Sequence, residues 1–415
     1  MTDHNYFYIT TTLPYINAEP HIGFAAEIIR ADAIARGLLP HLLACATAAT
    51  AWQATLAFWL RRAWRLLPSA CLWLLLILLA THLFNHSGAF GSLAAAQVAL
   101  ANTVRDRLQK TSPQARLLVC PTQYSGDPST DYLVEMGNGL HPQIDVMWTG
   151  PRVCSQELSF EHTEAVAASL RRPITFWDNY PVNDASMRGE LHIWPYTGRS
   201  PALAQVSRGF FLNPMNQAEA SKIALGAAAI YMKDPDRYDP EAAWRVSAAR
   251  VVGEASVDAL AMFRDACAIS PLHPDDPPNL VRVVDDAKYR MDRGSLLEAA
   301  GILSAHMLEM KAAAELLRTN PNKKLIQEIA PWLDEYIEWA DVGLEIARAV
   351  EAASSYAESL TAAGKSSSFS MSALSVAGAR SRLARTLQRT IGFRTRVCSD
   401  VLLRLGLEIV RRLRY

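Results

Sequence analysis

The sequence predicts an α/β fold with parallel strands, followed by an all-helical domain. Between about residues 90 and 238, four short apolar runs alternate with helical stretches, which is the pattern of successive βαβ units. After Asp239 no further strand-like run occurs, and apolar residues recur at helical spacing. The chain has 415 residues, half of them hydrophobic, which is enough for two or three domains with a sizeable core.

The α/β region begins with a predicted amphipathic helix at Ser92–Leu108, with Leu93, Leu100 and Val104 among its apolar positions. Four predicted strands follow, and each ends in polar or aromatic residues. The strands are Arg116–Cys120, Ile144–Trp148, Ile174–Trp177 and Gly209–Leu212. The helices between and after them are Thr130–Met136, His162–Leu170 and Ala218–Met232.

Three long helices are predicted in the second region, at Pro240–Ile269, Leu280–Thr319 and Leu325–Ala353. A serine-rich break follows at Ser366–Ser370. The segment from Arg380 onward carries ten arginines interleaved with apolar residues. This pattern is typical of an exposed basic helix or a disordered tail, with contact to an anionic membrane surface or to nucleic acid as alternatives.

The amino-terminal part has an unusual composition, because no Asp or Glu occurs from Ala33 to Arg105. Leu66–Phe84 is 19 residues long without a charged side chain, about the length that crosses a bilayer core. A second apolar run, Leu38–Leu60, precedes it. One interpretation is a membrane hairpin with a basic loop, and the other is a linker that belongs to no evolved domain.

Charge balance and cysteine spacing argue against a nucleic-acid partner and against a metal or cofactor site. Lys plus Arg equals Asp plus Glu, at 41 each, so the overall balance predicts no nucleic-acid partner. The six cysteines include no CxxC pair and none at metal-ligand spacing, so we expect neither a metal nor a cofactor. No cleavable signal peptide is visible, which leaves a cytoplasmic or membrane-associated location open.

The strand ends carry the chemistry that the sequence predicts. In a parallel barrel the carboxyl ends of the strands meet at one mouth, where active sites lie. Here the residues after the four strands include a tyrosine, tryptophans, an aspartate and several asparagines. Aromatic rings form flat apolar walls, and short amides and carboxylates hydrogen-bond hydroxyl groups. This composition indicates a sugar-binding pocket.

Five motifs in order sharpen that interpretation: CPTQYSGD, IDVMWTGPRVCS, WDNYPVND, YTGRS and FLNPMNQAEASKIAL. They resemble the catalytic domain of glycoside hydrolase family 84, the O-GlcNAcase-like β-N-acetylglucosaminidases. The resemblance covers about residues 90–351. It implies a partial (β/α) TIM-type barrel, the carboxyl-terminal half of the family's barrel, followed by an all-α helical domain.

The predicted organisation has five parts: a synthetase-like fragment at 1–36, a hydrophobic segment at 37–89, the partial barrel at 90–238, a helical domain at 239–356, and a serine-rich linker with a basic amphipathic tail at 357–415. The first part, YFYITTTLPYINAEPHIGFAAEIIRADAIAR, resembles the start of methionyl-tRNA synthetase. It carries His21, Gly23 and Phe24 where class I synthetases have a HIGH signature. No KMSKS-like loop follows, so we expect no aminoacylation.

The family resemblance implies a set of substrate-binding residues. Tyr124 and Trp177 would line the pocket for the N-acetyl group. Asn179 would hydrogen-bond the sugar beside the reacting centre, and Asp184 would bind the outer hydroxyls with help from Asn213.

Family members use two adjacent aspartates in substrate-assisted retaining hydrolysis, and the resemblance places that pair upstream of residue 92. No acid occurs from Ala33 to Arg105, so the sequence predicts no catalytic residue in this chain and an impaired glycosidase. The alternatives are a non-catalytic membrane-attached or scaffold protein, or an inactive product of gene rearrangement. The expected partners are an N-acetylglucosamine-containing glycan or glycoprotein, a membrane through 38–84, and a second copy at the open barrel edges.

Overall fold

The computed structural model describes residues 90–361 and 366–413. The synthetase-like fragment and the apolar runs between 38 and 84 lie outside these ranges. Within them, no helix combines the length and the apolar character that a bilayer crossing needs. The described residues form two compact units, one made of 90–153, 159–177 and 202–211, and the other of 154–158, 178–201 and the rest from 212.

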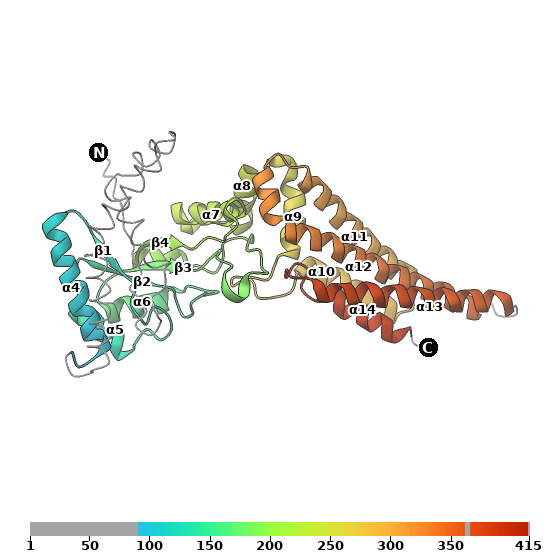
Figure 1. Ribbon diagram of the computed structural model, residues 1–415, viewed down its shortest axis with the longest axis horizontal. Coiled ribbons are helices and arrows are strands. Elements are labelled where there is room, and N and C mark those ends of the chain that lie inside the picture. The colour runs from blue at the N-terminus through green and yellow to red at the C-terminus, as the bar shows by residue number, and fades with distance from the viewer. Residues whose placement is uncertain (1–89, 362–365, 414–415) are drawn as a thin grey trace, which may run out of the picture. The chain divides into compact units, whose positions relative to one another are not determined.

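The first unit contains a four-stranded sheet with the strands in chain order, which Figure 1 shows side by side. β1 and β2 are parallel, and Leu117 pairs with Ile144. β2 and β3 are also parallel, with Trp148 opposite Phe176. The elements around this sheet are α4 (Leu93–Thr111), β1 (Leu117–Val119), α5 (Asp131–Gly139), β2 (Ile144–Trp148), α6 (Phe160–Leu170), β3 (Ile174–Asp178) and β4 (Ser207–Leu212).

Local sequence explains where the helices of this unit begin. Ser92, Thr130 and Ser159 precede α4, α5 and α6, and each side-chain oxygen accepts a hydrogen bond from a backbone N–H of the first turn. Such caps satisfy donors that have no partner inside the helix. All five residues of β2 are buried, as expected for a central parallel strand covered on both faces. The predicted α/β class with parallel strands is confirmed.

The connection from β3 to β4 differs from the others, because two short 3-10 turns replace the α-helix. These are η1 (Ala185–Met187) and η2 (Pro201–Gln205). Most of this long connection, residues 178–201, belongs to the second unit.

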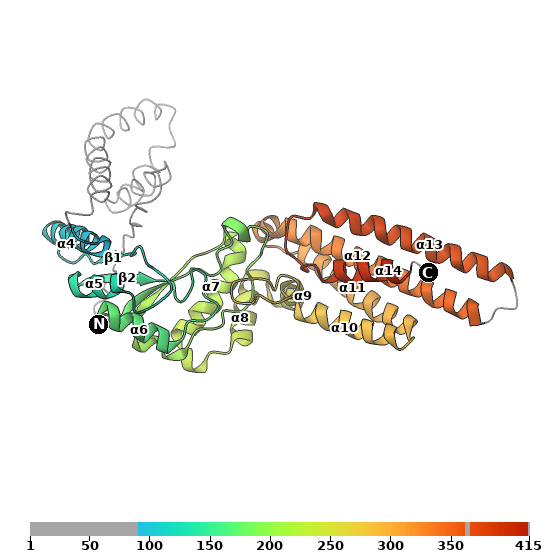
Figure 2. The same ribbon diagram turned by 90° about the horizontal axis from the view of Figure 1, so that it is seen from below.

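The second unit is helical apart from that connection and residues 154–158. Figures 1 and 2 show α11, α12 and α13 running alongside one another. Its α-helices are α7 (Ala218–Lys233), α8 (Pro240–Val252), α9 (Val257–Ala266), α10 (Pro278–Asp292), α11 (Leu296–Arg318), α12 (Lys323–Thr361), α13 (Ser366–Arg389) and α14 (Val401–Arg412), and its shorter turns are η3 (Pro235–Arg237), η4 (Glu254–Ser256) and η5 (Thr390–Gly392).

Two of the three predicted long helices are interrupted. Gly253 separates α8 from α9 with φ +79°, and Gly294 separates α10 from α11 with φ +81°. Glycine adopts this left-handed conformation at little cost, so the chain turns at these positions. Apolar spacing alone did not reveal the breaks. By contrast, α12 continues through Pro331, within the predicted Leu325–Ala353 helix.

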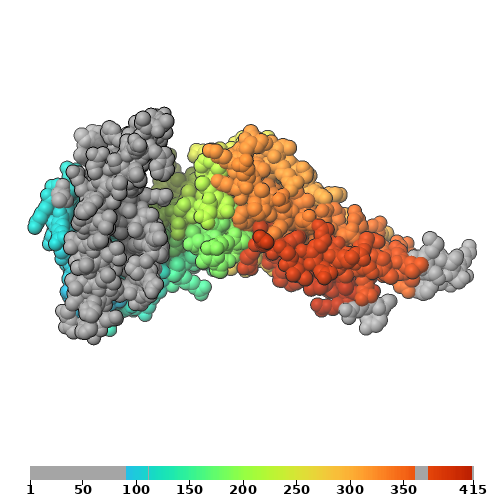
Figure 3. All heavy atoms as spheres, viewed as in Figure 1, coloured from blue at the N-terminus to red at the C-terminus, as the bar shows by residue number. Residues whose placement is uncertain are grey.

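The carboxyl-terminal segment packs onto the helical unit. Leu383, Leu387, Leu405 and Ile409 are all buried in its core. Its arginines pair with acids of earlier helices, including Arg412 with Asp292 at 2.9 Å. Figure 3 shows these last helices lying against the preceding ones. The interpretation as an exposed or disordered tail is therefore wrong for residues 380–413.

Candidate functional site

A buried ion pair follows directly from the end of β3. Asp178, the last residue of that strand, accepts hydrogen bonds from Arg199 Nη2 at 2.6 Å and Arg199 Nε at 2.8 Å. The Tyr196 hydroxyl donates to the same carboxylate at 2.6 Å. All three side chains are buried, so this three-residue clamp is shielded from solvent. A bidentate guanidinium fixes a carboxylate in both position and orientation.

The electrostatics of the clamp follow from burial and pairing. Burial, and then the Asp178 carboxylate, raise the pKa of the Tyr196 phenol well above its usual value. Burial alone would lower the pKa of Arg199, but the negative charge of Asp178 outweighs it and raises that pKa. Tyr196 is therefore a neutral donor and Arg199 a permanent cation.

Backbone carbonyls use the remaining donors of Arg199. Nη1 donates to Gln156 at 2.9 Å and Thr197 at 2.8 Å, and Nη2 donates to Ser155 at 3.2 Å. The guanidinium thus ties the strand end to two separate backbone segments of the second unit. This arrangement satisfies a buried charge that would otherwise be costly.

Asn179 and Asn213 form an amide pair immediately after the clamp. The side-chain nitrogen of Asn213 donates to Asn179 Oδ1 at 3.0 Å, and the Asn213 backbone N–H donates to the Asp178 carbonyl at 3.0 Å. The structure therefore brings together two of the predicted sugar-binding residues that are 34 positions apart in sequence. Their amides present fixed donors and acceptors of the kind that recognise sugar hydroxyl and acetamide groups.

Asp184 lies five residues further along the same connection and is exposed. It precedes the 3-10 turn η1, but its carboxylate does not cap that turn. Its backbone carbonyl instead accepts from the Met187 N–H at 2.8 Å. The backbone is thus held in place while the carboxylate faces solvent, where it can accept hydrogen bonds from hydroxyl groups.

Two tryptophans of the helices and one of the connection itself link residues 178–201 to the helices. Trp332 Nε1 donates to the Gly189 carbonyl at 2.8 Å, and Trp244 Nε1 donates to the Ile193 carbonyl at 2.6 Å. In the reverse direction, Trp194 Nε1 donates to the Arg264 carbonyl at 2.8 Å. The helical unit therefore positions the residues that surround Asp184.

In the first unit, Tyr124 and Trp177 lie together. Their ring centroids are 6.1 Å apart with planes inclined by 34°, and both side chains are partly exposed. The Tyr124 carbonyl accepts from the Thr149 N–H at 2.8 Å, which joins the loops after β1 and β2. A pair of tilted rings at a strand end is a suitable wall for the apolar face of a sugar or for a methyl group.

Two further observations concern metal ligands and the next acid after Asp184 in the sequence. No group of three or more metal-ligating side chains occurs among them. Glu190, near Asp184, is buried and bound to His192 Nε2 at 2.9 Å. The second unit thus offers an amide pair and one exposed carboxylate, and the first unit offers a pair of partly exposed aromatic rings.

Comparison with known proteins identifies the family. A family model described as β-N-acetylglucosaminidase matches residues 80–265. The solved structure of a Thermobaculum terrenum O-GlcNAc hydrolase, an aspartate-to-asparagine mutant, is 34% identical with a TM-score of 0.72. The match covers 78% of this chain and 67% of that one. The chain belongs to the β-N-acetylglucosaminidase family.

For the other relatives, the match to this β-N-acetylglucosaminidase family member covers a smaller share of the relative's length. The rat and mouse proteins named Protein O-GlcNAcase are 37% and 35% identical over 150 residues. That match is 35% of this chain but only 16% of each relative. The structure of CpGH84B, at 22% identity and a TM-score of 0.62, matches 74% of this chain and 54% of its own and supports the fold alone. A second family model, class I tRNA synthetases (M), matches residues 7–39.

The sequence predicted a set of sugar-binding residues but not the clamp of Asp178, Tyr196 and Arg199. Asp178 and Arg199 were present in the quoted motifs WDNYPVND and YTGRS. An acid at the end of a buried strand needs a compensating cation, and that requirement was a usable signal. Nothing in the spacing indicated that Arg199, 21 residues later, supplies the cation.

Proposed function

We propose that this chain binds terminal β-linked N-acetylglucosamine on glycoproteins and hydrolyses it poorly or not at all. Tyr124 and Trp177 contact the N-acetyl group, Asn179 and Asn213 hydrogen-bond the sugar, and Asp184 binds its outer hydroxyls. The hydrogen-bonded pair of Asn179 and Asn213 supports this proposal, because the two amides are already positioned without a ligand. A preformed site avoids the entropy cost of ordering these groups on binding.

The surroundings of Asp178 at the end of β3 and of Asp184 after it support the proposal of impaired hydrolysis. A glycosidase needs a carboxylic acid that can protonate the leaving oxygen. Both oxygens of Asp178 are already bound by Arg199 and Tyr196, so it cannot reach a glycosidic bond. Asp184 is exposed to water and lacks the apolar surroundings that tune a general acid. From residue 33 to 105 the sequence supplies no other acid.

The proposed substrate class follows from the names of the relatives, which are Protein O-GlcNAcase for the rat and mouse proteins and O-GlcNAc hydrolase for the solved structure. A serine-linked N-acetylglucosamine on a short peptide is therefore the ligand to test first. Contact with a membrane through 38–84 and self-association at sheet edges stay predictions.

Two assays on the full chain test the proposal: titration calorimetry with the glycopeptide, and hydrolysis of a fluorogenic β-N-acetylglucosaminide. We expect saturable binding with turnover no faster than buffer. Asn213→Ala and Asp184→Asn should each weaken binding about tenfold, the effect of roughly 1.4 kcal/mol of lost hydrogen bonding.

Matched controls come from exposed residues of the same types. Asn138→Ala in α5 and Asp236→Asn in η3 should leave binding unchanged. Turnover that disappears in Asp184→Asn would contradict the claim of impairment. Absence of saturable binding in a folded sample would contradict the proposed sugar site itself.

A further inference from the structure

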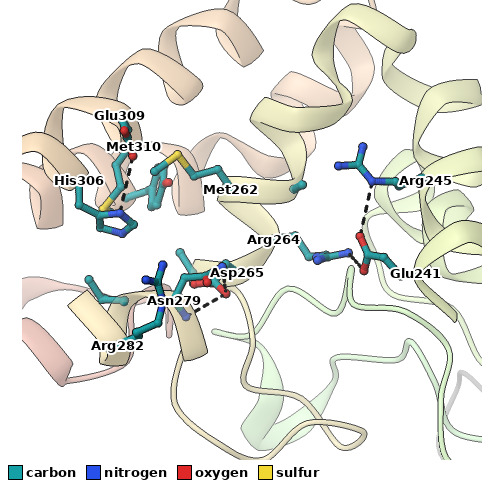
Figure 4. Close-up of a pocket in the computed structure, with 14 residues that line it drawn as sticks. Glu241, Arg245, Met262, Arg264, Asp265, Asn279, Arg282, His306, Glu309 and Met310 are labelled. Atoms are coloured by element: carbon teal, nitrogen blue, oxygen red, sulfur yellow. Dashed lines mark hydrogen bonds and ion pairs between the residues drawn. The ribbon is translucent and has the colours of Figure 1, made fainter. Parts of the chain in front are cut away.

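The helical unit contains a cavity of about 360 Å³, formed by residues of α8, α9, α10, α11 and α12. Figure 4 shows Arg282 and His306 on one side of it and Arg264 with Glu241 on the other. Cavities that hold small molecules start at about 300 Å³. The size therefore suits a compact metabolite.

The acidic side chains that line this cavity already have partners. Glu241 binds Arg264 Nη1 at 2.8 Å and lies 3.8 Å from Arg245. Asp265 Oδ1 accepts from the side chain of Asn279 at 3.0 Å and from its backbone N–H at 3.3 Å. Glu309 lies 3.9 Å from His306 Nδ1 and is 69% exposed. Its exposure means that water already solvates this carboxylate.

Several donors lining the same cavity lack an acceptor among the described residues. The Tyr336 hydroxyl and Arg264 Nε are buried without a hydrogen-bond partner. Arg282 also lines the cavity and is exposed, so its charge is accessible to a ligand. Buried donors without an acceptor cost about 1–3 kcal/mol each, so an acceptor-rich ligand would recover that energy. The unused hydrogen-bonding capacity of the cavity is thus on the donor side.

The rest of the lining favours a ligand that is more than a bare inorganic ion. Arg264 stacks over the Trp244 ring at 4.1 Å and over Trp194 at 5.2 Å, which fixes its orientation. Leu280, Met262 and Met310 supply apolar surface. Methionine adapts its shape to irregular ligands.

We propose that this cavity binds a small acidic metabolite whose carboxylate or phosphate oxygens accept hydrogen bonds from Arg282, Arg264 and Tyr336. The body of the ligand packs against the leucine and the two methionines. The site is separate from the proposed sugar site, and its occupation does not depend on glycosidase activity.

Titration calorimetry of the full chain with four probes tests the proposal. Glucose 6-phosphate and glucose differ only by the phosphate, and citrate and inorganic phosphate separate carboxylate from phosphate recognition. We expect saturable binding of glucose 6-phosphate, citrate or both, no binding of glucose, and weaker binding of inorganic phosphate.

Two variants assign the binding to this cavity. Arg282→Gln removes an exposed charge, and Tyr336→Phe removes only a hydroxyl that has no partner, so the midpoint of thermal unfolding should not fall in either. Each should weaken the acidic probe at least fivefold. Arg250→Gln, an exposed arginine of α8 that does not line the cavity, should leave it unchanged.

Other outcomes would overturn the proposal. Equal weakening in Arg250→Gln would mean that the probes respond only to net charge. Binding unaffected by Arg282→Gln and Tyr336→Phe would place the ligand elsewhere. No saturable binding of glucose 6-phosphate or citrate would leave the cavity without the proposed ligand. A lower unfolding midpoint in Tyr336→Phe would show that the hydroxyl serves the fold. Asp184→Asn should not change any of these titrations, so failure of the sugar site is distinguishable.

Discussion

The connection after β3 contains buried polar interactions that the helical core of the same unit largely lacks. Residues 178–201 combine buried apolar side chains such as Leu191 and Ile193 with a buried ion pair and indole-to-carbonyl hydrogen bonds. The core between α7 and α14 depends on aliphatic and aromatic packing, with Leu303, Met307 and Ile346 fully buried. Polar interactions are directional and fix a loop in one conformation, whereas apolar packing contributes most of the energy.

The difference predicts that the helices and the connection differ in their tolerance to substitution. The helices tolerate many side chains provided that volume and pattern are kept, because hydrophobic burial is not directional. The connection tolerates few changes, since each donor of Arg199 has a specific acceptor. A rigid polar loop on a hydrophobic scaffold is the arrangement expected of a binding site.

The largest expected effect is on the clamp. Arg199→Met leaves the Asp178 carboxylate buried without a cation, which should lower the free energy of unfolding by about 3–5 kcal/mol. Urea denaturation monitored by circular dichroism measures it. Arg318→Met removes an exposed ion pair to Asp334 and should cost under about 1 kcal/mol. Equal losses in the two variants would remove the contrast between buried and exposed pairs.

A core substitution tests the other half of the comparison. Leu303→Ala in α11 leaves a cavity among fully buried side chains and should cost about 2–5 kcal/mol. Leu297→Ala in the same helix is 54% exposed and should cost about 0.5 kcal/mol or less. The same denaturation experiment reports both. A glycopeptide affinity that falls with Leu303→Ala in the folded protein would show that the core also sets the geometry of the loop.

Removing the Tyr196 hydroxyl tests how much a single directional hydrogen bond contributes to the stability of the clamp. Tyr196→Phe deletes a hydrogen bond to a charged acceptor, Asp178, and should cost about 1.5–3 kcal/mol. Tyr289→Phe, whose ring is 59% exposed, should change the unfolding free energy by about 0.5 kcal/mol or less. If Tyr196→Phe is as mild as the control, then Arg199 alone holds the carboxylate.

The smallest expected effect is a pH dependence of the free energy of unfolding that arises from His162 in the first unit. Trp148 Nε1 donates to His162 Nε2 at 3.2 Å, so the imidazole must be unprotonated there. Burial lowers the pKa of His162, although nearby Asp127 opposes this. The unfolded state then binds a proton more readily, and stability is lost as pH falls from about 6.5 toward the folded pKa.

Urea denaturation at pH 7.5 and 5.5 measures this dependence. His162→Gln should lose less stability between the two pH values than the natural chain does, because its side chain cannot titrate. An identical loss in both proteins would assign the pH dependence to other groups.

The secondary structure was largely predictable from sequence. The Ile144–Trp148 strand coincides with β2, and the other three strands and the helices α4 to α7 deviate by at most three residues at either end. These elements have strong local signals: apolar runs bounded by turns, and capping residues such as Ser92 and Ser159. The helix breaks at Gly253 and Gly294 were missed, since a single glycine does not disturb apolar spacing enough to be decisive.

What the sequence determined by itself was the parallel α/β class, the helical region after it, the family resemblance and the set of polar residues at the strand ends. Local periodicity and short motifs carry that information, because each depends on residues close together in the chain. Only the tertiary structure decided that Arg199 neutralises Asp178, that Asn213 meets Asn179, and that the arginine-rich end packs into the helical core. Long-range partners depend on how the backbone folds back on itself, so no local pattern specifies them.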